Sequence, residues 1–342
     1  MDFGIFTDFP VREGMVVTEA FDEAFSQVEL ADRAGIDSVW LAEYHFSPDR
    51  SVSSAPLVIG SAVAARTTNI RIGLAVQVLP LFNPLRVAEE VATMDQVSKG
   101  RFNFGIGRSG STRFYDVFGV DYSESRSRFY ESLDVILGAW TQESYSHHGE
   151  HFDFDDVSVV PKPYQKPYPP FRVAIASEDS YSQMGEMGYP IFVMSNTPLP
   201  QLEERVSQYR DAWISAGHPG SGDVMLRAPA FVSESADEAY SVPEASTMHG
   251  IAYRVRELIA TAANQEVIDR LKKVADVPYD EILKARCIYG TPDAVVERIH
   301  EFDDRLGLNG ILMEVNYGGQ IPYDKVVNTI QLLADRVMPK FR

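Results

Sequence analysis

The sequence predicts a (β/α)8 TIM barrel with a helical insertion before the last strand. Eight short runs that favour β-strands alternate with longer helical stretches, a pattern typical of strands and helices wound around a parallel sheet. Two of the runs, Ser38-Val-Trp-Leu41 and Val173-Ala-Ile-Ala176, carry no charge and are apolar apart from Ser38, as expected for parallel strands that are buried on both faces. A length of 342 residues suits one such barrel, and an open, doubly wound sheet is the alternative.

The expected strands are short and are bounded by polar or turn-forming residues. They cover residues 2–9, 38–44, 70–79, 102–108, 171–177, 190–196, 224–233 and 310–315. Helical patterns fill the intervals, chiefly over residues 18–34, 55–66, 84–98, 123–140, 199–216 and 291–306. Gly35 and Gly217 each follow the last turn of an expected helix, which is where glycine commonly ends one.

Two insertions interrupt the alternation without dividing the chain. Residues 147–170 are rich in His, Asp, Pro and Tyr, and we expect a hairpin and a loop there. Residues 234–286 are mostly helical and precede the last strand, where they could close over the site as a lid. Neither insertion has the composition of a linker, so a single domain is expected over residues 1–342.

The composition excludes several classes of protein. With 31 basic and 49 acidic residues the formal charge is −18, so we expect neither nucleic acid nor a membrane surface as a partner. No apolar run approaches the roughly 18 residues of a membrane helix. The N-terminus resembles a first strand rather than a signal peptide, which favours a cytoplasmic protein. The single cysteine, Cys287, excludes an internal disulfide and a cysteine-based metal site.

Polar side chains gather where the expected strands end, which is the end of a barrel that carries active sites. The second strand ends in Glu43, Tyr44 and His45, and alternation directs Glu43 and His45 to one side and Tyr44 to the other. A carboxylate beside an imidazole can orient it and raise its pKa, as a general acid or base requires. These three residues are candidate catalytic groups, although a structurally buried histidine would give the same pattern.

A second group of residues suits a phosphate. Arg108 ends the fourth strand, Arg126 lies in the next helix, and Ser177 and Ser180 stand at the turn into a helix expected at residues 181–188. Guanidinium groups form bidentate bonds to phosphate oxygens, and hydroxyl and N–H groups at a helix N-terminus bind anions. The structural alternative makes Ser177 a helix cap and places Ser180 in the first turn.

Two other patterns are set aside. The run Gly105-Ile-Gly-Arg-Ser-Gly110 matches the dinucleotide fingerprint, but it follows the fourth strand rather than the first, and residues 111–119 lack a helical apolar stripe. Its small residues are expected instead to let a ligand ring approach the backbone. His147, His148 and His151 match no metal-binding spacing, so we expect a surface hairpin there and no metal site.

Several segments together resemble the bacterial luciferase-like flavin-dependent monooxygenases. The longest is Asp95-Gln-Val-Ser-Lys-Gly-Arg-Phe-Asn-Phe-Gly-Ile-Gly-Arg108, and another is Val117-Phe-Gly-Val-Asp-Tyr-Ser-Glu-Ser-Arg126. Shorter matches are Trp40-Leu-Ala-Glu-Tyr-His-Phe46, Val78-Leu-Pro80 with Asn83-Pro84, Pro161-Lys-Pro-Tyr-Gln-Lys-Pro167 and Tyr289-Gly-Thr-Pro-Asp-Ala-Val295. The resemblance spans most of the chain and is weakest over residues 234–286.

The resemblance implies a barrel that binds reduced FMN at its rim. Arg108 and Arg126 match arginines at the flavin phosphate, and Ser177 and Ser180 match the hydroxyl pair that holds the phosphate. The same comparison implies a homodimer.

Other positions carry over as part of the flavin pocket or depart from the family pattern. Ala75 and Val76 fall where the family often has a non-prolyl cis peptide beneath the flavin ring, and Phe6, like Glu43 and His45, falls at a pocket position. Tyr44 stands where the light-emitting subunits have a histidine, and Gly107 stands where many of them have a cysteine. These departures argue against light emission while leaving monooxygenase chemistry open.

The function implied is that of a two-component flavin-dependent monooxygenase. A flavin reductase would supply reduced FMN, O2 would form a flavin peroxide or hydroperoxide, and a small organic substrate would be oxygenated. The alternatives are a deazaflavin-dependent oxidoreductase of the same barrel family and a non-catalytic partner subunit.

For the homodimer, Val87, Val91 and Met94 offer an apolar stripe, which could equally face the barrel.

Overall fold

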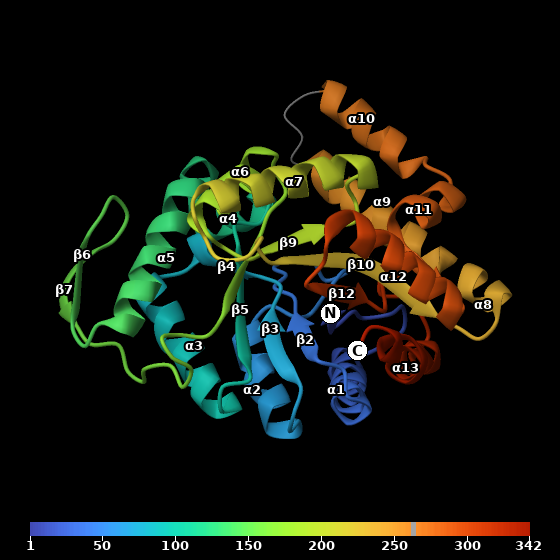
Figure 1. Cartoon of the computed structure of the whole chain (residues 1–342), viewed down its shortest axis with the longest axis horizontal. Helices are drawn as coiled ribbons and strands as arrows, with labels where there is room; N and C mark the ends of the chain where they lie inside the picture. Colours follow the sequence, from blue (N-terminus) through green and yellow to red (C-terminus); the bar gives the residue numbers. More distant parts are fainter. Residues whose placement is uncertain (261–264) are drawn as a thin grey trace.

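The computed structural model describes residues 1–260 and 265–342 and confirms the (β/α)8 barrel (Figure 1). Eight parallel strands form a closed ring in the order β1-β2-β3-β5-β8-β9-β10-β12, and pairing of β12 with β1 completes it. The ring strands are β1 (Asp2–Thr7), β2 (Ser38–Leu41), β3 (Arg71–Leu74), β5 (Phe102–Gly107), β8 (Phe171–Ala174), β9 (Ile191–Met194), β10 (Val224–Val232) and β12 (Gly310–Glu314). Each lies within one of the eight expected runs.

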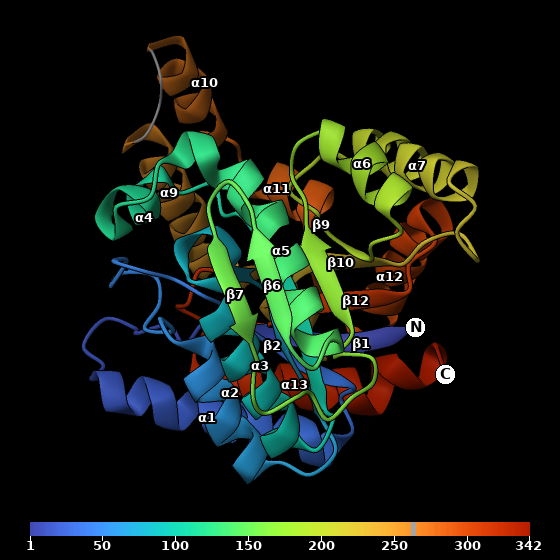
Figure 2. The ribbon, with the colours of Figure 1, turned by 90° about the vertical axis from the view of Figure 1, so that its left-hand side faces the viewer.

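The helices surround the ring, as Figures 1 and 2 show from two sides. The helices outside the second insertion are α1 (Val17–Ala34), α2 (Pro56–Arg66), α3 (Pro84–Ser98), α5 (Ser125–Thr141), α6 (Asp179–Met187), α7 (Leu199–Ser215), α12 (Pro292–Leu306) and α13 (Tyr323–Leu332), together with the short α4 (Thr112–Phe118). Short turns of helix complete the chain at Leu79–Leu81, Tyr122–Glu124, Leu333–Val337 and Met338–Lys340. The helices expected from the sequence are confirmed, with ends that differ by one or two residues.

Both insertions have the expected character. The first contains an antiparallel hairpin of β6 (Tyr145–His148) and β7 (Asp153–Val157), which lies outside the barrel beside α5 in both views. The second contains α8 (Ala236–Ser241), α9 (Glu244–Ala260), α10 (Gln265–Ala275) and α11 (Tyr279–Arg286). After it, β11 (Ile288–Gly290) extends the sheet beside β10. Residues 261–264 of this insertion lie outside the described residues.

One expected strand needs correction. The run at residues 70–79 is not one strand, because β3 ends at Leu74 and β4 (Gln77–Val78) pairs separately with β5. A short helix that was not among the expected ones, α4 (Thr112–Phe118), follows β5. Its Phe114 and Phe118 are four residues apart and both contact the ring of His45.

The barrel interior is filled by side chains below the rim. Trp40 from β2 and Phe192 from β9 meet edge to face, with ring centroids 4.9 Å apart, and Leu312 packs in the same cluster. Gly73 makes room for the indole, because a Cβ at that position would lie 2.1 Å from Trp40 Cε3. The lower interior is therefore closed, and a ligand has to bind at the carboxyl ends of the strands.

The apolar stripe on α3 faces the protein's own core. Val87, Val91 and Met94 are all buried within the chain, so they pack on the barrel and do not form a free surface. No helix among the described residues has both the length and the apolar character needed to cross a bilayer.

Candidate active site

A cavity of about 400 Å3 opens at the carboxyl ends of the barrel strands. It lies within the range of about 300–1,000 Å3 that ligand and cofactor sites occupy. Its lining combines residues that follow β3, β5 and β8, which are distant in sequence. Ala75, Val76, Arg108, Ser177 and Ser180, all predicted from the sequence, are brought together in this lining.

One part of the cavity presents cationic and hydroxyl groups. Arg108 Nη1 donates to Ser125 Oγ at 3.1 Å, and the hydroxyls of Ser177 and Ser180 lie 2.6 Å apart beside the start of α6. Within the described residues Arg108 forms no ion pair with a carboxylate, so its positive charge is not neutralised by the protein. This arrangement suits an anion, because both the guanidinium and the helix N-terminus favour negative charge.

Arg126 stands at the edge of this region and does not line the cavity itself. It is exposed on α5, and its Nη2 donates to Oε1 of Gln183 on α6 at 2.6 Å. Its neighbour Tyr130 does line the cavity, and burial raises the pKa of the Tyr130 phenol while Arg126 acts in the opposite direction. The bond to Gln183 uses only one of the three guanidinium nitrogens of Arg126.

A different part of the wall is formed by the turn between β3 and β4. The Ala75–Val76 peptide bond is cis, as the family resemblance predicted. Gly107, at the end of β5, lies against it, because a Cβ on Gly107 would be 2.7 Å from Val76 Cγ2. Gly107 therefore leaves room for the Val76 side chain, and both residues line the cavity.

The predicted carboxylate–imidazole pair is present after β2. Glu43 Oε1 and His45 Nε2 are 2.9 Å apart, and Gln77 Nε2 donates to the other Glu43 oxygen at 2.6 Å. Burial raises the pKa of Glu43, although its hydrogen bonds to His45, Val78 and Gln77 oppose that shift. The carboxylate is buried and has three hydrogen-bond partners.

Tyr44 and His45 occupy different environments, although strand β2 ends at Leu41, before the three residues to which alternation was applied. The rings of Phe114 and Phe118 meet the imidazole edge to face, with centroids 5.4 Å and 5.0 Å away, and His45 is only 6% exposed. Tyr44 and Glu43 line a second cavity of about 140 Å3, whereas His45 is absent from the lining of both cavities described here. His45 can therefore act on a ligand only through Glu43 or after a movement of the aromatic side chains.

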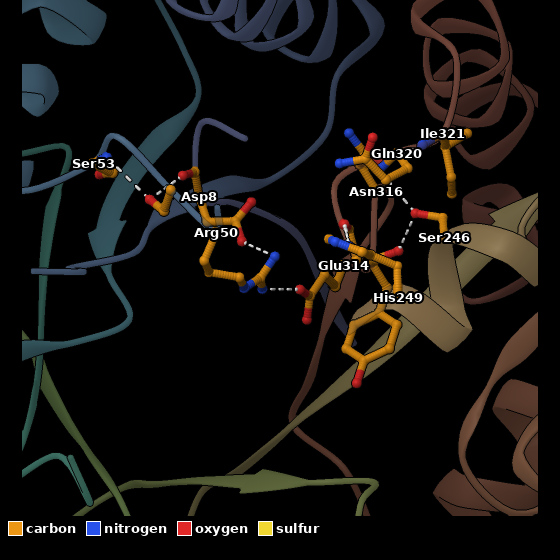
Figure 3. A network of polar contacts seen from close by, with 12 residues as sticks. Asp8, Arg50, Ser53, Ser246, His249, Glu314, Asn316, Gln320 and Ile321 are labelled. Atoms are coloured by element: carbon orange, nitrogen blue, oxygen red, sulfur yellow. Dashed lines mark hydrogen bonds and ion pairs between the residues drawn. The ribbon is translucent and has the colours of Figure 1, made fainter. Parts of the chain in front are cut away.

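A buried network of four charged residues, not predicted from the sequence, lies beside these cavities. Arg50 forms ion pairs with Asp8 and Glu314, the latter at 2.8 Å, as the close view in Figure 3 shows. Arg227 Nη2 pairs with the other Glu314 oxygen at 2.7 Å, and its guanidinium carbon lies 3.5 Å from the centroid of the Phe6 ring. Arg227 also lines the larger cavity.

The pKa values of the two carboxylates in this network are shifted in opposite directions. Burial raises the pKa of Asp8 to about 6, even though Arg50 opposes the shift. Burial alone would also raise the pKa of Glu314, but Arg227 and Arg50 together hold it below its usual value. Glu314 is the carboxylate of this network that pairs with both arginines, and their charges favour its ionised form.

One signal in the sequence could have revealed the network. Arg227 interrupts an apolar run in β10, and a charged side chain inside a buried strand needs a partner. The identity of the partner is not local, however, because Arg50 and Glu314 are 264 positions apart.

The histidine-rich segment is a surface hairpin, as predicted. His147 Nε2 is 3.1 Å from Glu131 Oε1, and exposed His148 faces Asp153 and Asp155, each at 3.3 Å. No group of three side chains suited to a metal ion occurs among residues 1–260 and 265–342.

The closed ring and its rim cavity define a TIM-barrel protein with a candidate ligand site at the carboxyl ends of the strands. Comparison with known proteins is more specific. The sequence profile described as "luciferase-like monooxygenase" matches residues 1–309. The oxygenase component of a flavin-dependent trigonelline monooxygenase from Acinetobacter baylyi is 24% identical over 352 residues, covering 100% of this chain and 96% of the relative.

Solved structures share the fold over the full length. Monooxygenase RslO1 from Streptomyces bottropensis has a TM-score of 0.84 and 26% identity, with 100% of both chains covered. The oxygenating constituent of 3,6-diketocamphane monooxygenase from Pseudomonas putida, solved with FMN, has a TM-score of 0.83 and 21% identity, covering 99% and 98%. A coenzyme F420 dependent tetrahydromethanopterin reductase from Methanopyrus kandleri has a TM-score of 0.76 and 18% identity, covering 100% and 99%.

The chain belongs to the luciferase-like monooxygenase family, because that family's profile covers nearly all of it. It is accordingly an enzyme, an oxidoreductase of the monooxygenase class.

Proposed function

We propose that the protein is the oxygenase component of a two-component flavin-dependent monooxygenase. It would take reduced FMN from a separate flavin reductase, use O2, and oxygenate a small organic substrate. The observation that supports this most directly is the larger cavity, where Arg108, Ser177 and Ser180 share a wall with the Ala75–Val76 peptide. The name of the Acinetobacter relative, an oxygenase component, supports the separate reductase.

The residues present fit FMN at both ends of the cofactor. Arg108, Ser177, Ser180 and the N-terminus of α6 form a donor set for a phosphate, with Arg126 close by. The wall formed by Ala75, Val76 and Gly107 carries only small or aliphatic groups, against which a flat ring could pack. When bound, reduced FMN would supply the two electrons that activate O2, with one oxygen atom entering the substrate and the other leaving as water.

The remaining residues would bind, orient and exclude water. Tyr44 presents a phenol to the smaller cavity and is our candidate for proton exchange with a bound molecule. Glu43 also lines that cavity, and its contact with His45 would tie the end of β2 to the aromatic side chains around the imidazole. In this proposal His45 is a positioning residue, and Tyr44 and Glu43 face the reacting molecules.

The two arginines provide the test. Replacing Arg108 and Arg126 together with alanine should weaken FMN binding by about 100-fold or more, because each charge-assisted bond contributes roughly 1.5–3 kcal/mol. Anaerobic titration of the protein with reduced FMN measures this affinity. Arg128→Ala is the matched control, because Arg128 lies on the same helix and pairs with Glu124 outside the cavity.

Two titrations test the phosphate site and distinguish FMN from coenzyme F420 as the cofactor. Unchanged FMN affinity in the double variant would sink the proposed site. Parallel titration with coenzyme F420 decides between the two cofactors, since a preference for F420 would replace this function with hydride transfer.

We also propose that the enzyme works as a cytoplasmic homodimer. The support is the family resemblance, together with exposed Val58 on α2 and Val97 on α3. Light scattering on the purified protein would establish its mass.

A further inference from the structure

The smaller cavity adjoins the larger one at a shared wall. Ala75, Val76 and Arg254 line both cavities. A molecule in the smaller cavity would therefore lie next to the Ala75–Val76 peptide, where the proposed function places the flavin ring. This position is the one that a substrate needs to occupy for oxygen transfer.

The walls and the volume of the smaller cavity suit a single ring. Tyr44 follows β2, Phe114 comes from α4 and Tyr253 comes from α9, so three separate elements contribute aromatic side chains. The volume of about 140 Å3 resembles the roughly 150 Å3 of an apolar protein cavity that accommodates benzene. Aromatic walls favour a flat or cyclic apolar body.

Arg254 brings an unneutralised charge to this cavity. It lies on α9 and forms no hydrogen bond or ion pair with any residue of the ranges 1–260 and 265–342. The cavity wall thus carries an exposed guanidinium that has no carboxylate partner among the described residues. On the same helix, Arg256 does find one, because its Nη2 is 3.1 Å from Asp49 Oδ2.

Neither of the two acidic residues in this wall, Glu43 and Glu257, forms an ion pair with Arg254. Glu43 is held by Gln77 and His45. Glu257, one turn further along α9, lines the same cavity and by itself would repel an anion. The phosphate end of the larger cavity has Arg108, with Arg126 beside it, so it needs no third guanidinium.

We propose that the smaller cavity is the substrate pocket and that it takes a monocyclic carboxylate, whose carboxylate group pairs with Arg254. This inference rests on the proposed function, because it assigns the substrate class of the same site. A guanidinium pairs with a carboxylate through two parallel N–H···O bonds, so Arg254 would fix the orientation of the ring as well as its charge. Through Arg254, helix α9 of the second insertion would contribute to substrate specificity.

Benzoate and its neutral isostere benzamide are the probes. Calorimetric titration of FMN-loaded protein should give an affinity for benzoate about 10-fold or more above that for benzamide, as expected for one partly exposed charge-assisted pair. Arg254→Gln should remove this preference and leave benzamide binding unchanged, and Glu257 would then favour the neutral probe. Arg254→Lys should retain part of the preference, whereas the control Arg256→Gln should retain all of it.

Each other outcome contradicts the inference. Equal affinity for the two probes, no binding of either, or an unchanged preference in Arg254→Gln would overturn it. A loss of FMN affinity in Arg254→Gln would assign the arginine to the cofactor instead. Failure of the wild-type protein to bind FMN at all would sink the proposed function, and that titration is carried out first.

Discussion

Asp8 and Glu314 pair with the same arginine, yet pH affects their contributions to stability in opposite directions. Burial raises the pKa of Asp8 to about 6, so the folded protein holds a proton that the unfolded chain releases above its ordinary pKa of 3.8. The net effect of the arginines lowers the pKa of Glu314 below its ordinary 4.5. Ionised Glu314 therefore stabilises the fold, and ionised Asp8 carries a cost.

Two substitutions separate these effects. Relative to Asp8→Asn, the free energy of unfolding of the wild type should fall as pH rises from about 4 to 6, because Asp8 must lose its bound proton across that window. Relative to Glu314→Gln, the wild-type advantage should be fully present above pH 4.5 and be lost as pH falls through the lowered pKa of Glu314. Urea unfolding at several pH values measures both, and a common sign for the two differences would contradict the assignment.

Contacts between residues close in the sequence could be predicted from the sequence pattern, whereas contacts between distant residues could not. Strand alternation alone predicts that Glu43 and His45 share a side, because that pair is two positions apart. The contact of Arg50 with Glu314 depends on strands β2 and β12 lying either side of β1, which no local pattern encodes. Similarly, periodicity could not predict that the phenol of Tyr44, rather than His45, would face the cavity.

At the scale of elements, buried strands were predictable because each gives a continuous apolar run. The cis peptide that separates β3 from β4 has no signature in hydrophobic spacing, and only the family resemblance pointed to it. Helix α4 escaped prediction for a related reason. Helix α4 has only 7 residues, which is too short for the repeated spacing of apolar side chains that identifies a longer helix.

The β6–β7 hairpin depends on a single acidic side chain from α5. Glu131 accepts from the backbone N–H groups of Phe152 at 2.8 Å and His151 at 3.0 Å, and it also contacts His147. Although its partial burial would raise the pKa of Glu131, these hydrogen bonds lower it overall. The carboxylate thus holds the turn of a hairpin that otherwise lies outside the barrel (Figure 2).

Glu131→Gln should therefore loosen the hairpin without affecting the cavity. Losing hydrogen bonds to a charged acceptor costs roughly 1.5–3 kcal/mol, so exchange of the hairpin amides should quicken by about 10-fold or more. Hydrogen exchange followed by mass spectrometry detects this change. The control Glu150→Gln removes the same charge from an exposed position in the hairpin and should leave exchange nearly unchanged. Equal protection in Glu131→Gln and wild type would show that strand pairing alone holds the hairpin.

On the scale of the whole molecule, the formal charge of −18 opposes the ligand that the site is proposed to bind. The field of the protein extends over roughly 10 Å at 0.1 M salt, and it repels an approaching phosphate before Arg108 can attract it. The guanidinium and hydroxyl groups act mainly at short range, once the phosphate is in contact with them. The net negative charge is thus expected to slow the association of FMN, and the positive charge of Arg108 is expected to slow its dissociation.

Salt should consequently speed the association of FMN, whereas salt would slow association with a uniformly cationic site. Raising NaCl from about 20 to 200 mM screens the long-range repulsion, so the association rate of FMN should increase several-fold in stopped-flow fluorescence. Riboflavin, which has the same ring and no phosphate, is the control and should associate at a rate nearly independent of salt. In Arg108→Ala the acceleration should persist while dissociation becomes faster, because the distant acidic residues are unchanged and the contact is lost. An FMN association rate that falls with salt would mean that the local guanidinium groups, and not the net charge, dominate the approach.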